Sequence, residues 1–221
     1  MKLLCQALVK FTAGLLLVGV LLFLPAGSLA YPNGWLFIAL LFLPMLCLGA
    51  VMLVKAPALL SKRLSVKEGE KTQRGVVAVS GLLFLAGFTV AGLDFRFGWS
   101  RVPLGVTVAA SVILLVSYAL YAEVMRENAY LSRTVEVQEG QRVVDTGLYG
   151  IVRHPMYAVT LWLFLSIPVV LGSWWALLCF LPYVAVIAVR IRNEEKVLEA
   201  GLDGYTDYKK RVKYRLFPFI W

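Results

Sequence analysis

Residues 155–189 read PMYAVTLWLFLSIPVVLGSWWALLCFLPYVAVIAV, and none of these 35 positions carries a charged side chain. A helix rises about 1.5 Å per residue and needs roughly 20 residues to cross a bilayer core of about 30 Å. The run is therefore too long for one span and slightly short for two. At its middle, residues 171–175 (LGSWW) combine a glycine and a serine that permit a tight reversal with two tryptophans that suit the membrane interface. We predict a helical hairpin over 155–189 whose arms each barely span the bilayer, kinked at Pro168 and Pro182.

Other uncharged runs predict four spans before this hairpin. No charged residue lies between Lys10 and Lys55, and these 44 residues can hold two helices joined by a turn at Tyr31-Pro32-Asn33-Gly34. The first of the two is interpreted as a retained helix and not as a cleaved signal peptide. Residues 75–93 and 102–122 supply the third and fourth spans.

The composition agrees with a chain that lies in a membrane. Of 221 residues, 60% are hydrophobic and 16% are charged, and the mean hydropathy is +0.79. Soluble domains are about half apolar and about a quarter charged, and disordered chains are weakly hydrophobic, so both classes are excluded. The predicted fold class is an all-α integral membrane protein with about six transmembrane helices and a C-terminal helical hairpin.

The net charge of +9 follows from the membrane topology and does not require a nucleic-acid partner. With the N-terminus placed in the cytoplasm, 20 of the 22 Lys and Arg residues fall on the cytoplasmic side, and only Arg96 and Arg101 lie outside. This distribution obeys the positive-inside rule and predicts that both termini are cytoplasmic. The three cysteines are scattered and His154 is the single histidine, so neither a zinc site nor a disulfide framework is expected.

The chain divides into two regions of different character. Residues 1–122 are nearly pure span and turn, and we predict a four-helix transmembrane region there. Residues 123–221 hold two polar stretches around the hairpin, and we predict that they form the catalytic region, with a cytoplasmic loop, the hairpin and an amphipathic tail. The halves do not repeat each other and no span has a charge near its middle, which speaks against a transporter.

The first polar stretch leads into the hairpin at residues 123–154. Residues 136–144 alternate in polarity and then turn at Gly140. Pro155 suits the first position of a helix and keeps His154 out of the α region, so an anionic group could bind at this helix N-terminus. The alternative is structural: Arg153 is then a membrane anchor, His154 a cap, and the nearby tyrosines interface residues. The density of histidine, proline, glycine and tyrosine favours function for His154.

The second polar stretch begins at the end of the hairpin. Arg190 and Glu194 are four residues apart and share a helix face. They could form an exposed salt bridge worth a few tenths of a kcal/mol, or they could line a cavity and receive opposite charges of a ligand. Arg192 and Glu195 are expected in solvent. The tail at 201–221 is basic and aromatic, which is typical of a segment lying on anionic lipid.

Taken in order, these stretches resemble the isoprenylcysteine carboxyl methyltransferase family, in the wider group that includes membrane phospholipid methyltransferases. The resemblance runs from about Glu127 to the C-terminus. Its motifs are Val143-Val144, Gly147-x-Tyr149, Arg153-His154-Pro155-x-Tyr157, Arg190-x-x-x-Glu194-Glu195, Tyr205-x-x-Tyr208 and Arg215-Leu216-Phe217-Pro218.

The resemblance implies a methyltransferase that binds S-adenosyl-L-methionine at the cytoplasmic face, without a Rossmann domain. It assigns Arg190 to binding of the acceptor and names Arg190 and His154 as the catalytic residues. The implied cofactor-binding residues are Gln141, Arg142, Val143, Val144, Tyr149, His154, Pro155, Met156, Tyr157 and Glu194. A lipid or lipidated acceptor would enter from the bilayer, and neither a nucleic acid nor an obligate protein partner is expected.

The acceptor determines how much acid–base chemistry is needed. A carboxylate, as in isoprenylcysteine-type O-methylation, is already nucleophilic, so proximity and alignment can supply most of the catalysis. An amine or hydroxyl must lose a proton, and His154 or Glu195 would then be the base. Two other enzymes remain open, an NADPH-dependent membrane reductase of sterol or steroid type and a phospholipid N-methyltransferase. A non-catalytic transporter or scaffold is the remaining alternative.

Overall fold

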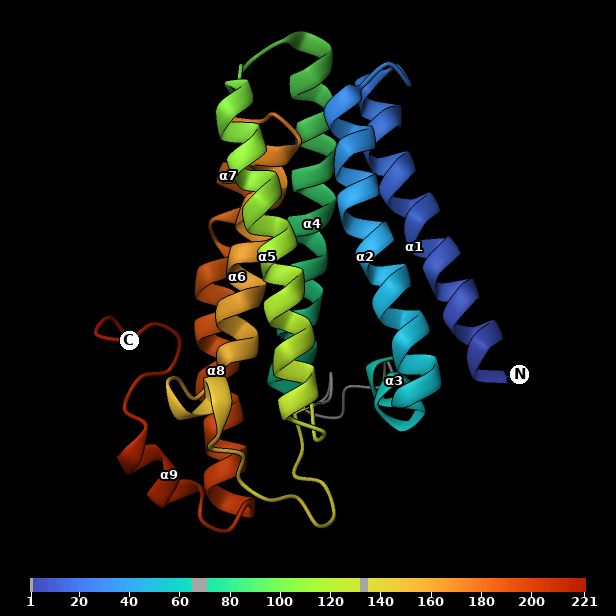
Figure 1. The fold of residues 1–221 in the computed structure, drawn as a ribbon. Helices are drawn as coiled ribbons and strands as arrows, with labels where there is room; N and C mark the ends of the chain where they lie inside the picture. Colours follow the sequence, from blue (N-terminus) through green and yellow to red (C-terminus); the bar gives the residue numbers. More distant parts are fainter. Residues whose placement is uncertain (1, 65–70, 132–134) are drawn as a thin grey trace.

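A computed structural model describes residues 2–64, 71–131 and 135–221, and within these ranges the chain is helical with no strand (Figure 1). The α-helices are α1 (Lys2–Ala26), α2 (Pro32–Lys55), α3 (Pro57–Leu64), α4 (Lys71–Phe97), α5 (Leu104–Glu127), α6 (Pro155–Val170), α7 (Trp174–Phe180), α8 (Tyr183–Gly201) and α9 (Tyr205–Arg211). A 3₁₀ turn at Gly147–Gly150 precedes α6.

The helices confirm an integral membrane protein. Within the described residues, five stretches are long and apolar enough to cross a bilayer: α1, α2, α4 from Arg74, α5, and the α7–α8 arm over Trp174–Gly201. α6 is apolar but has 16 residues, which corresponds to about 24 Å. The count of six spans stays a prediction because it depends on how α6 sits in the membrane.

The predicted hairpin is present, but its arms are unequal. The chain reverses at residues 171–173, where Gly172 has a φ of 80° and the Ser173 side chain accepts a hydrogen bond from the Ala176 N–H. Pro182 separates α7 from α8. The expectation of two arms that each barely span was wrong for the second arm, because α8 does not end with the apolar run and continues to Gly201.

Other boundaries also differ from the prediction. The reversal predicted at Tyr31–Gly34 lies earlier, since Pro32 is already the first residue of α2 and Gly27, with a φ of 65°, follows α1. Pro32 fits there because the first helical position needs no N–H donor. α4 and α5 extend past the predicted spans 75–93 and 102–122, because charged residues at a helix end do not stop the helix.

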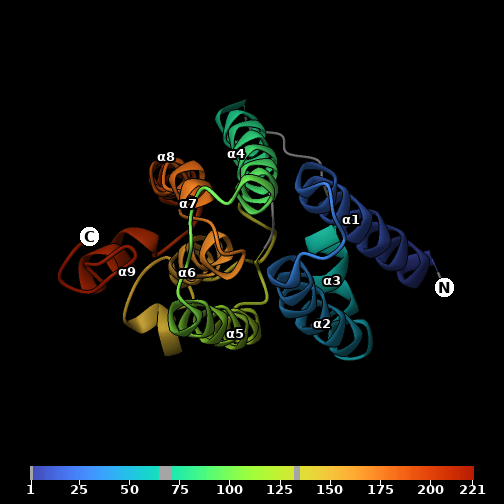
Figure 2. The same ribbon diagram turned by 90° about the horizontal axis from the view of Figure 1, so that it is seen from above.

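The hairpin packs between the helices of the first half. Seen from above, α6 lies between α5 and the α7–α8 arm, while α1 and α2 form a pair on the other side of α4 (Figure 2). An aromatic cluster joins α4 to the hairpin, with the ring centroids of Phe84 and Phe180 5.1 Å apart and those of Phe84 and Phe164 4.7 Å apart. The α4–α7 contact is close, because a Cβ at Gly87 would lie 2.2 Å from Phe180 Cε2.

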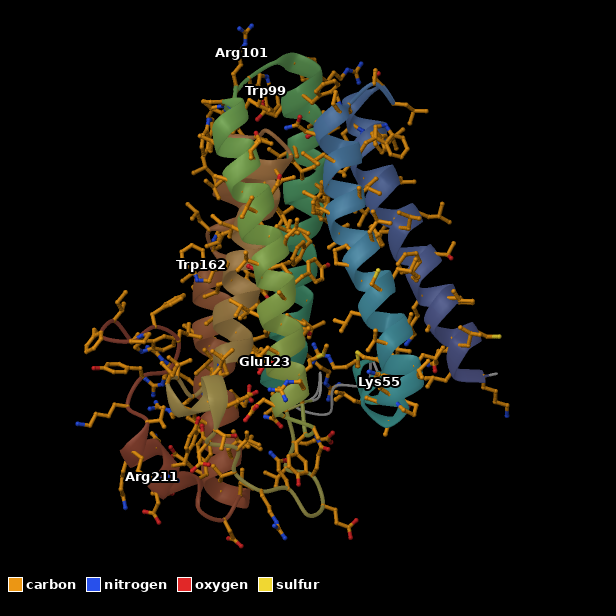
Figure 3. The ribbon with its side chains drawn as sticks, in the orientation of Figure 1. Lys55, Trp99, Arg101, Glu123, Trp162 and Arg211 are labelled. Atoms are coloured by element: carbon orange, nitrogen blue, oxygen red, sulfur yellow. The ribbon has the colours of Figure 1, made fainter. Side chains whose placement is uncertain are left out.

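Buried polar groups hold the tip of the hairpin. Asp94 near the end of α4 is buried and accepts hydrogen bonds from the Ser100 N–H at 2.7 Å and from the Ser173 hydroxyl. The Tyr31 hydroxyl donates to the Leu171 carbonyl at 2.6 Å. Trp99 and Arg101 lie at this end of the molecule, and Lys55, Glu123 and Arg211 lie at the opposite end (Figure 3).

Candidate active site

A polar cavity lies at the end of the molecule that carries Glu123 and Arg211. Its empty space is about 800 Å³ including its open mouth. Ten of the eleven predicted site residues line it: Gln141, Arg142, Val143, Val144, Tyr149, His154, Met156, Tyr157, Arg190 and Glu194. The remaining one, Pro155, is buried at the first position of α6. The structure thus brings together residues that are up to 53 positions apart in the sequence.

The entry to α6 is built as the sequence predicts. His154 precedes the helix with φ −126° and ψ 59°, and Pro155 is its first residue. The His154 carbonyl accepts hydrogen bonds from the N–H groups of Tyr157 and Ala158, at 3.1 and 3.2 Å. These two donors are therefore used within the first turn, which reduces what the helix N-terminus can offer to an anion.

Glu195 is the buried centre of an ion-pair network, and the expectation that it lies in solvent was wrong. The residue is 3% exposed. Its carboxylate accepts hydrogen bonds from Arg153 Nε at 2.8 Å and from Arg215 Nε at 2.9 Å, and His154 Nε2 lies 3.4 Å from it. Glu195 lies one residue beyond Glu194 on α8, about 100° around the helix, and it contacts the cavity-lining residues Arg153 and His154 from behind without lining the cavity itself.

The tail packs into the protein and completes this network. The N–H groups of Arg153 and His154 donate to the carbonyls of Tyr214 and Arg215, both at 2.9 Å. Arg153 Nη1 donates to the carbonyls of Val212 and Lys213. Four side chains of the tail are buried, namely Tyr205, Tyr208, Val212 and Leu216, whereas Phe219 and Ile220 near its end are more than 80% exposed. The expectation that the tail lies on lipid was therefore wrong for the four buried residues, since tertiary packing takes up the apolar face.

Arg190 and Glu194 are joined through Tyr157. Arg190 Nε donates to the Tyr157 hydroxyl at 2.8 Å, and that hydroxyl donates to Glu194 Oε2 at 2.5 Å. The Arg190 guanidinium also lies 5.8 Å from the centre of the Tyr157 ring. A side chain from α6 is thus inserted between the two α8 residues, so the exposed intrahelical salt bridge is not the arrangement found. The alternative in which both residues line a cavity is confirmed for their position.

A second, mostly apolar cavity lies deeper between α2, α4, α5, α6 and α8. Its volume is about 1430 Å³ including open space, and its lining includes Leu48, Met52, Val76 and Leu163. Three residues line both cavities: Met156, Tyr157 and Arg190. A polar and an apolar chamber therefore meet at the start of α6, and helices of the first half form the apolar wall.

Arg63 of α3 adds a second cation to the apolar cavity. Its guanidinium lies 5.4 Å from the centre of the Tyr121 ring, and its Nη1 lies 3.8 Å from Met156 Sδ. The described lining of this cavity carries Arg63 and Arg190 but no acidic side chain. The sequence reasoning missed Arg63, because the first half carried no recognisable motif.

Other lining residues of the polar cavity were also missed. They are Asn128, Tyr130, Leu131, Val135, Glu136, Arg153, Leu198, Leu202, Tyr205 and Tyr208. For Tyr205 and Tyr208 a signal existed in the tail motif. For residues 128–136 there was none, because a loop without periodicity does not reveal which side chains face a ligand.

Comparison with known proteins shows which proteins this chain is similar to. Residues 101–202 match the phospholipid methyltransferase family. Over 91 residues the chain is 34% identical to the uncharacterized protein YpbQ of Bacillus subtilis, which is 41% of this chain and 54% of that protein. Over 99 residues it is 28% identical to the Delta(14)-sterol reductase TM7SF2 of Mus musculus, which is 40% of this chain and 22% of that protein. The chain thus spans about half of YpbQ and about a fifth of the reductase.

A solved structure extends the likeness to nearly the whole chain. The eukaryotic intramembrane Ras methyltransferase ICMT, an isoprenylcysteine carboxyl methyltransferase, superposes with a TM-score of 0.54 at 18% identity, covering 97% of this chain and 77% of that one. At this identity the superposition establishes the fold. The resemblance seen in the sequence is therefore confirmed as a similarity: residues 101–202 match the model of the phospholipid methyltransferase family, and the chain shares the fold of this solved methyltransferase.

Proposed function

We propose that this chain is a membrane-embedded, S-adenosylmethionine-dependent methyltransferase that acts on a lipidic or lipidated acceptor. The observation that carries the proposal is the meeting of a polar and an apolar cavity at Met156, Tyr157 and Arg190. A water-soluble donor and a membrane-soluble acceptor need two chambers of opposite polarity that share one short boundary. The family match and the shared fold support the same reaction class.

The lining of the polar cavity fits S-adenosylmethionine in its chemistry. That molecule carries a sulfonium and an ammonium cation, ribose hydroxyls and a flat base. Glu194 can accept hydrogen bonds from hydroxyls or hold a cation, while Val143, Val144 and Tyr149 offer apolar and aromatic surface. When bound, S-adenosylmethionine supplies an electrophilic methyl group that a nucleophile attacks in line. The protein then has to orient the two partners and exclude water.

Arg190 and Tyr157 are the residues we place at the point of transfer. Arg190 would orient an anionic acceptor from the apolar side, and Tyr157 would hold Arg190 and Glu194 in register through its two hydrogen bonds. Because a guanidinium binds a carboxylate and repels an ammonium group, Arg190 favours a carboxylate acceptor over an amine. Glu195 is no longer a candidate base, because its carboxylate already accepts hydrogen bonds from Arg153 and Arg215. His154 lines the polar cavity and stays a candidate base if the acceptor is an amine or a hydroxyl.

The topology completes the proposal. We infer that the polar cavity and both termini face the cytoplasm, because 20 of 22 Lys and Arg residues lie on that side in the six-span arrangement. The acceptor would enter between helices from the bilayer. Residues 1–122 would act mainly as the lipid-facing wall and residues 123–221 as the catalytic region.

Methyl labelling of membranes tests the function and the acceptor class together. Membranes with and without the protein receive S-adenosylmethionine labelled in its methyl group, and the lipid and protein fractions are counted. A carboxyl methyl ester releases volatile methanol in mild alkali, whereas an N-methyl group or a methyl ether does not. Label that depends on the protein and is released by alkali is the expected result. Stable label would point to the phospholipid N-methyltransferase, and the absence of label together with no saturable binding of the donor would contradict the proposal.

The sterol-type reductase is the second candidate, because the chain is 28% identical to TM7SF2 over 99 residues. It predicts saturable binding of NADPH instead of S-adenosylhomocysteine. Titrating the purified protein with each ligand by calorimetry, in detergent and in lipid, separates the two enzymes.

A further inference from the structure

Tyr205 lines the polar cavity and carries a buried hydroxyl that is unpaired among the described residues. Tyr205 begins α9 in the tail, is 4% exposed and lines the cavity. Its Oη is buried and has no hydrogen-bond partner among the described residues. Leaving a buried hydroxyl unpaired costs free energy, and most such groups in native proteins have a partner. An unpaired hydroxyl that borders a ligand cavity therefore points to a partner on the ligand.

The neighbouring tyrosine shows that α9 can satisfy such a group when the protein itself supplies the acceptor. Tyr208 lies one turn later on the same face, with its ring centroid 5.8 Å from that of Tyr205. The Tyr208 hydroxyl donates to the Tyr149 carbonyl at 2.8 Å. Tyr208 thus fastens α9 to the turn before α6, whereas Tyr205 has the same chemistry and burial without that function.

The charges around Tyr205 limit which group of a ligand it can meet. Burial raises the pKa of Tyr205 above its ordinary value, and the nearby charges of Glu195 and Glu194 raise it further, so the hydroxyl keeps its proton at neutral pH and can donate. Arg153 and Arg215 compensate the charge of Glu195, whereas Glu194 lines the cavity itself and disfavours an anion beside it. A neutral acceptor, such as a ribose oxygen or a ring nitrogen of a nucleoside, suits the position better than a carboxylate.

We propose that Tyr205 is a ligand-binding residue whose hydroxyl donates a hydrogen bond to the nucleoside part of the methyl donor. This inference rests on the proposed function. It assigns to the tail a direct part in recognition, in addition to its packing against Arg153 and His154. It also accounts for the burial of a polar atom that the protein alone leaves unsatisfied.

The test uses Tyr205→Phe in the full chain, with Tyr208→Phe as the matched control. Removing an unpaired hydroxyl should leave the thermal stability of the ligand-free protein unchanged or higher, and should weaken binding of S-adenosylhomocysteine about 3- to 10-fold, as expected for one hydrogen bond. Tyr208→Phe should instead lower the melting temperature of the ligand-free protein, because it removes a made hydrogen bond.

A second ligand locates the contact. 5′-Methylthioadenosine keeps the nucleoside and the thioether but lacks the amino-acid part, so Tyr205→Phe should weaken its binding by the same factor. An effect with S-adenosylhomocysteine that vanishes with 5′-methylthioadenosine would overturn the nucleoside assignment. If the wild type binds these ligands and Tyr205→Phe binds them equally well, or if the variant loses stability without ligand, the role of Tyr205 is refuted while the proposed function stands. If the wild type binds neither ligand, the proposed function itself fails.

Discussion

Glu195 shows how a single buried carboxylate can organise the whole site. It joins Arg153 and His154 before α6 to Arg215 in the tail. Arg153 is itself buried, and Glu195 compensates its positive charge. Removing one member of a buried pair leaves the other charge uncompensated, which costs far more than losing an exposed pair.

We therefore expect Glu195→Gln to destabilise the protein by about 3–5 kcal/mol. The control is Glu199→Gln on the same helix, where the Lys209–Glu199 pair is about one-third exposed and the loss should stay below about 1 kcal/mol. Unfolding by heat or denaturant in detergent measures both. Equal stability of the two variants would mean that the buried network contributes no more than a surface pair.

Arg190 and Glu194 are predicted to act on different substrates, Arg190 on the acceptor and Glu194 on the methyl donor. Glu194→Ala should weaken binding of S-adenosylhomocysteine about tenfold, as expected for loss of a charge-assisted hydrogen bond. Arg190→Ala, which removes a residue that also lines the apolar cavity, should mainly lower turnover of the acceptor. Calorimetry and steady-state kinetics measure the two effects. The opposite pattern would show that the two roles are exchanged.

Among the elements, α4 and α7 make a close contact that helps to hold the hairpin to the first half. Gly87 allows it, because any larger residue would bring a Cβ to 2.2 Å from a ring carbon of the buried Phe180. Gly81, six residues earlier on the same helix, would place a Cβ in open space. The two glycines therefore lie on the same helix but differ in packing, so Gly81 is a matched control for Gly87.

Gly87→Ala should lower stability by about 1–3 kcal/mol through overpacking. Gly81→Ala should be neutral or stabilising by up to about 1 kcal/mol, because alanine favours a helix. The melting temperatures of the two variants in detergent measure this difference in stability. A stable Gly87→Ala protein would show that Phe180 can move aside without cost.

Across the whole molecule, the two halves meet at the apolar cavity, to which α2 contributes Gly49. A Cβ at Gly49 would meet no atom within 4 Å, and the same holds for Gly19 on α1, which does not line the cavity. Both positions thus have room for a Cβ, but only Gly49 lines the space that we assign to the acceptor.

Gly49→Phe should raise the KM for the lipid acceptor or lower turnover at least several-fold, and leave the affinity for S-adenosylhomocysteine unchanged. Gly19→Phe should change neither quantity. Kinetics with a defined acceptor and calorimetry with the cofactor product test both variants. If Gly49→Phe turned the acceptor over normally, the acceptor would have to bind elsewhere.

Much of the architecture was readable in the sequence because membrane helices obey a strong local constraint. An uncharged run of about 20 residues has to satisfy its backbone hydrogen bonds internally, so composition predicts a helix and Gly172 with Ser173 predicts the reversal. The ordered motifs likewise predicted ten residues that line one cavity. Helix ends were less predictable, as α8 shows, because a helix can continue into charged sequence where tertiary contacts support it.

Only the tertiary structure decided which polar residues are buried and what they meet. Glu194 and Glu195 are identical neighbours in the sequence, yet Glu194 lines a cavity. Glu195 instead joins Arg153, His154 and Arg215 in a buried network. Arg63 lines the apolar cavity and Tyr205 lines the polar cavity, although α3 and α9, which carry them, are far from the start of α6 in the sequence. Helix formation depends on local hydrogen bonds and on the length of an apolar run, and both can be read from the sequence. A site depends on side chains that are brought together from distant parts of the chain, and no local sequence pattern shows which ones meet.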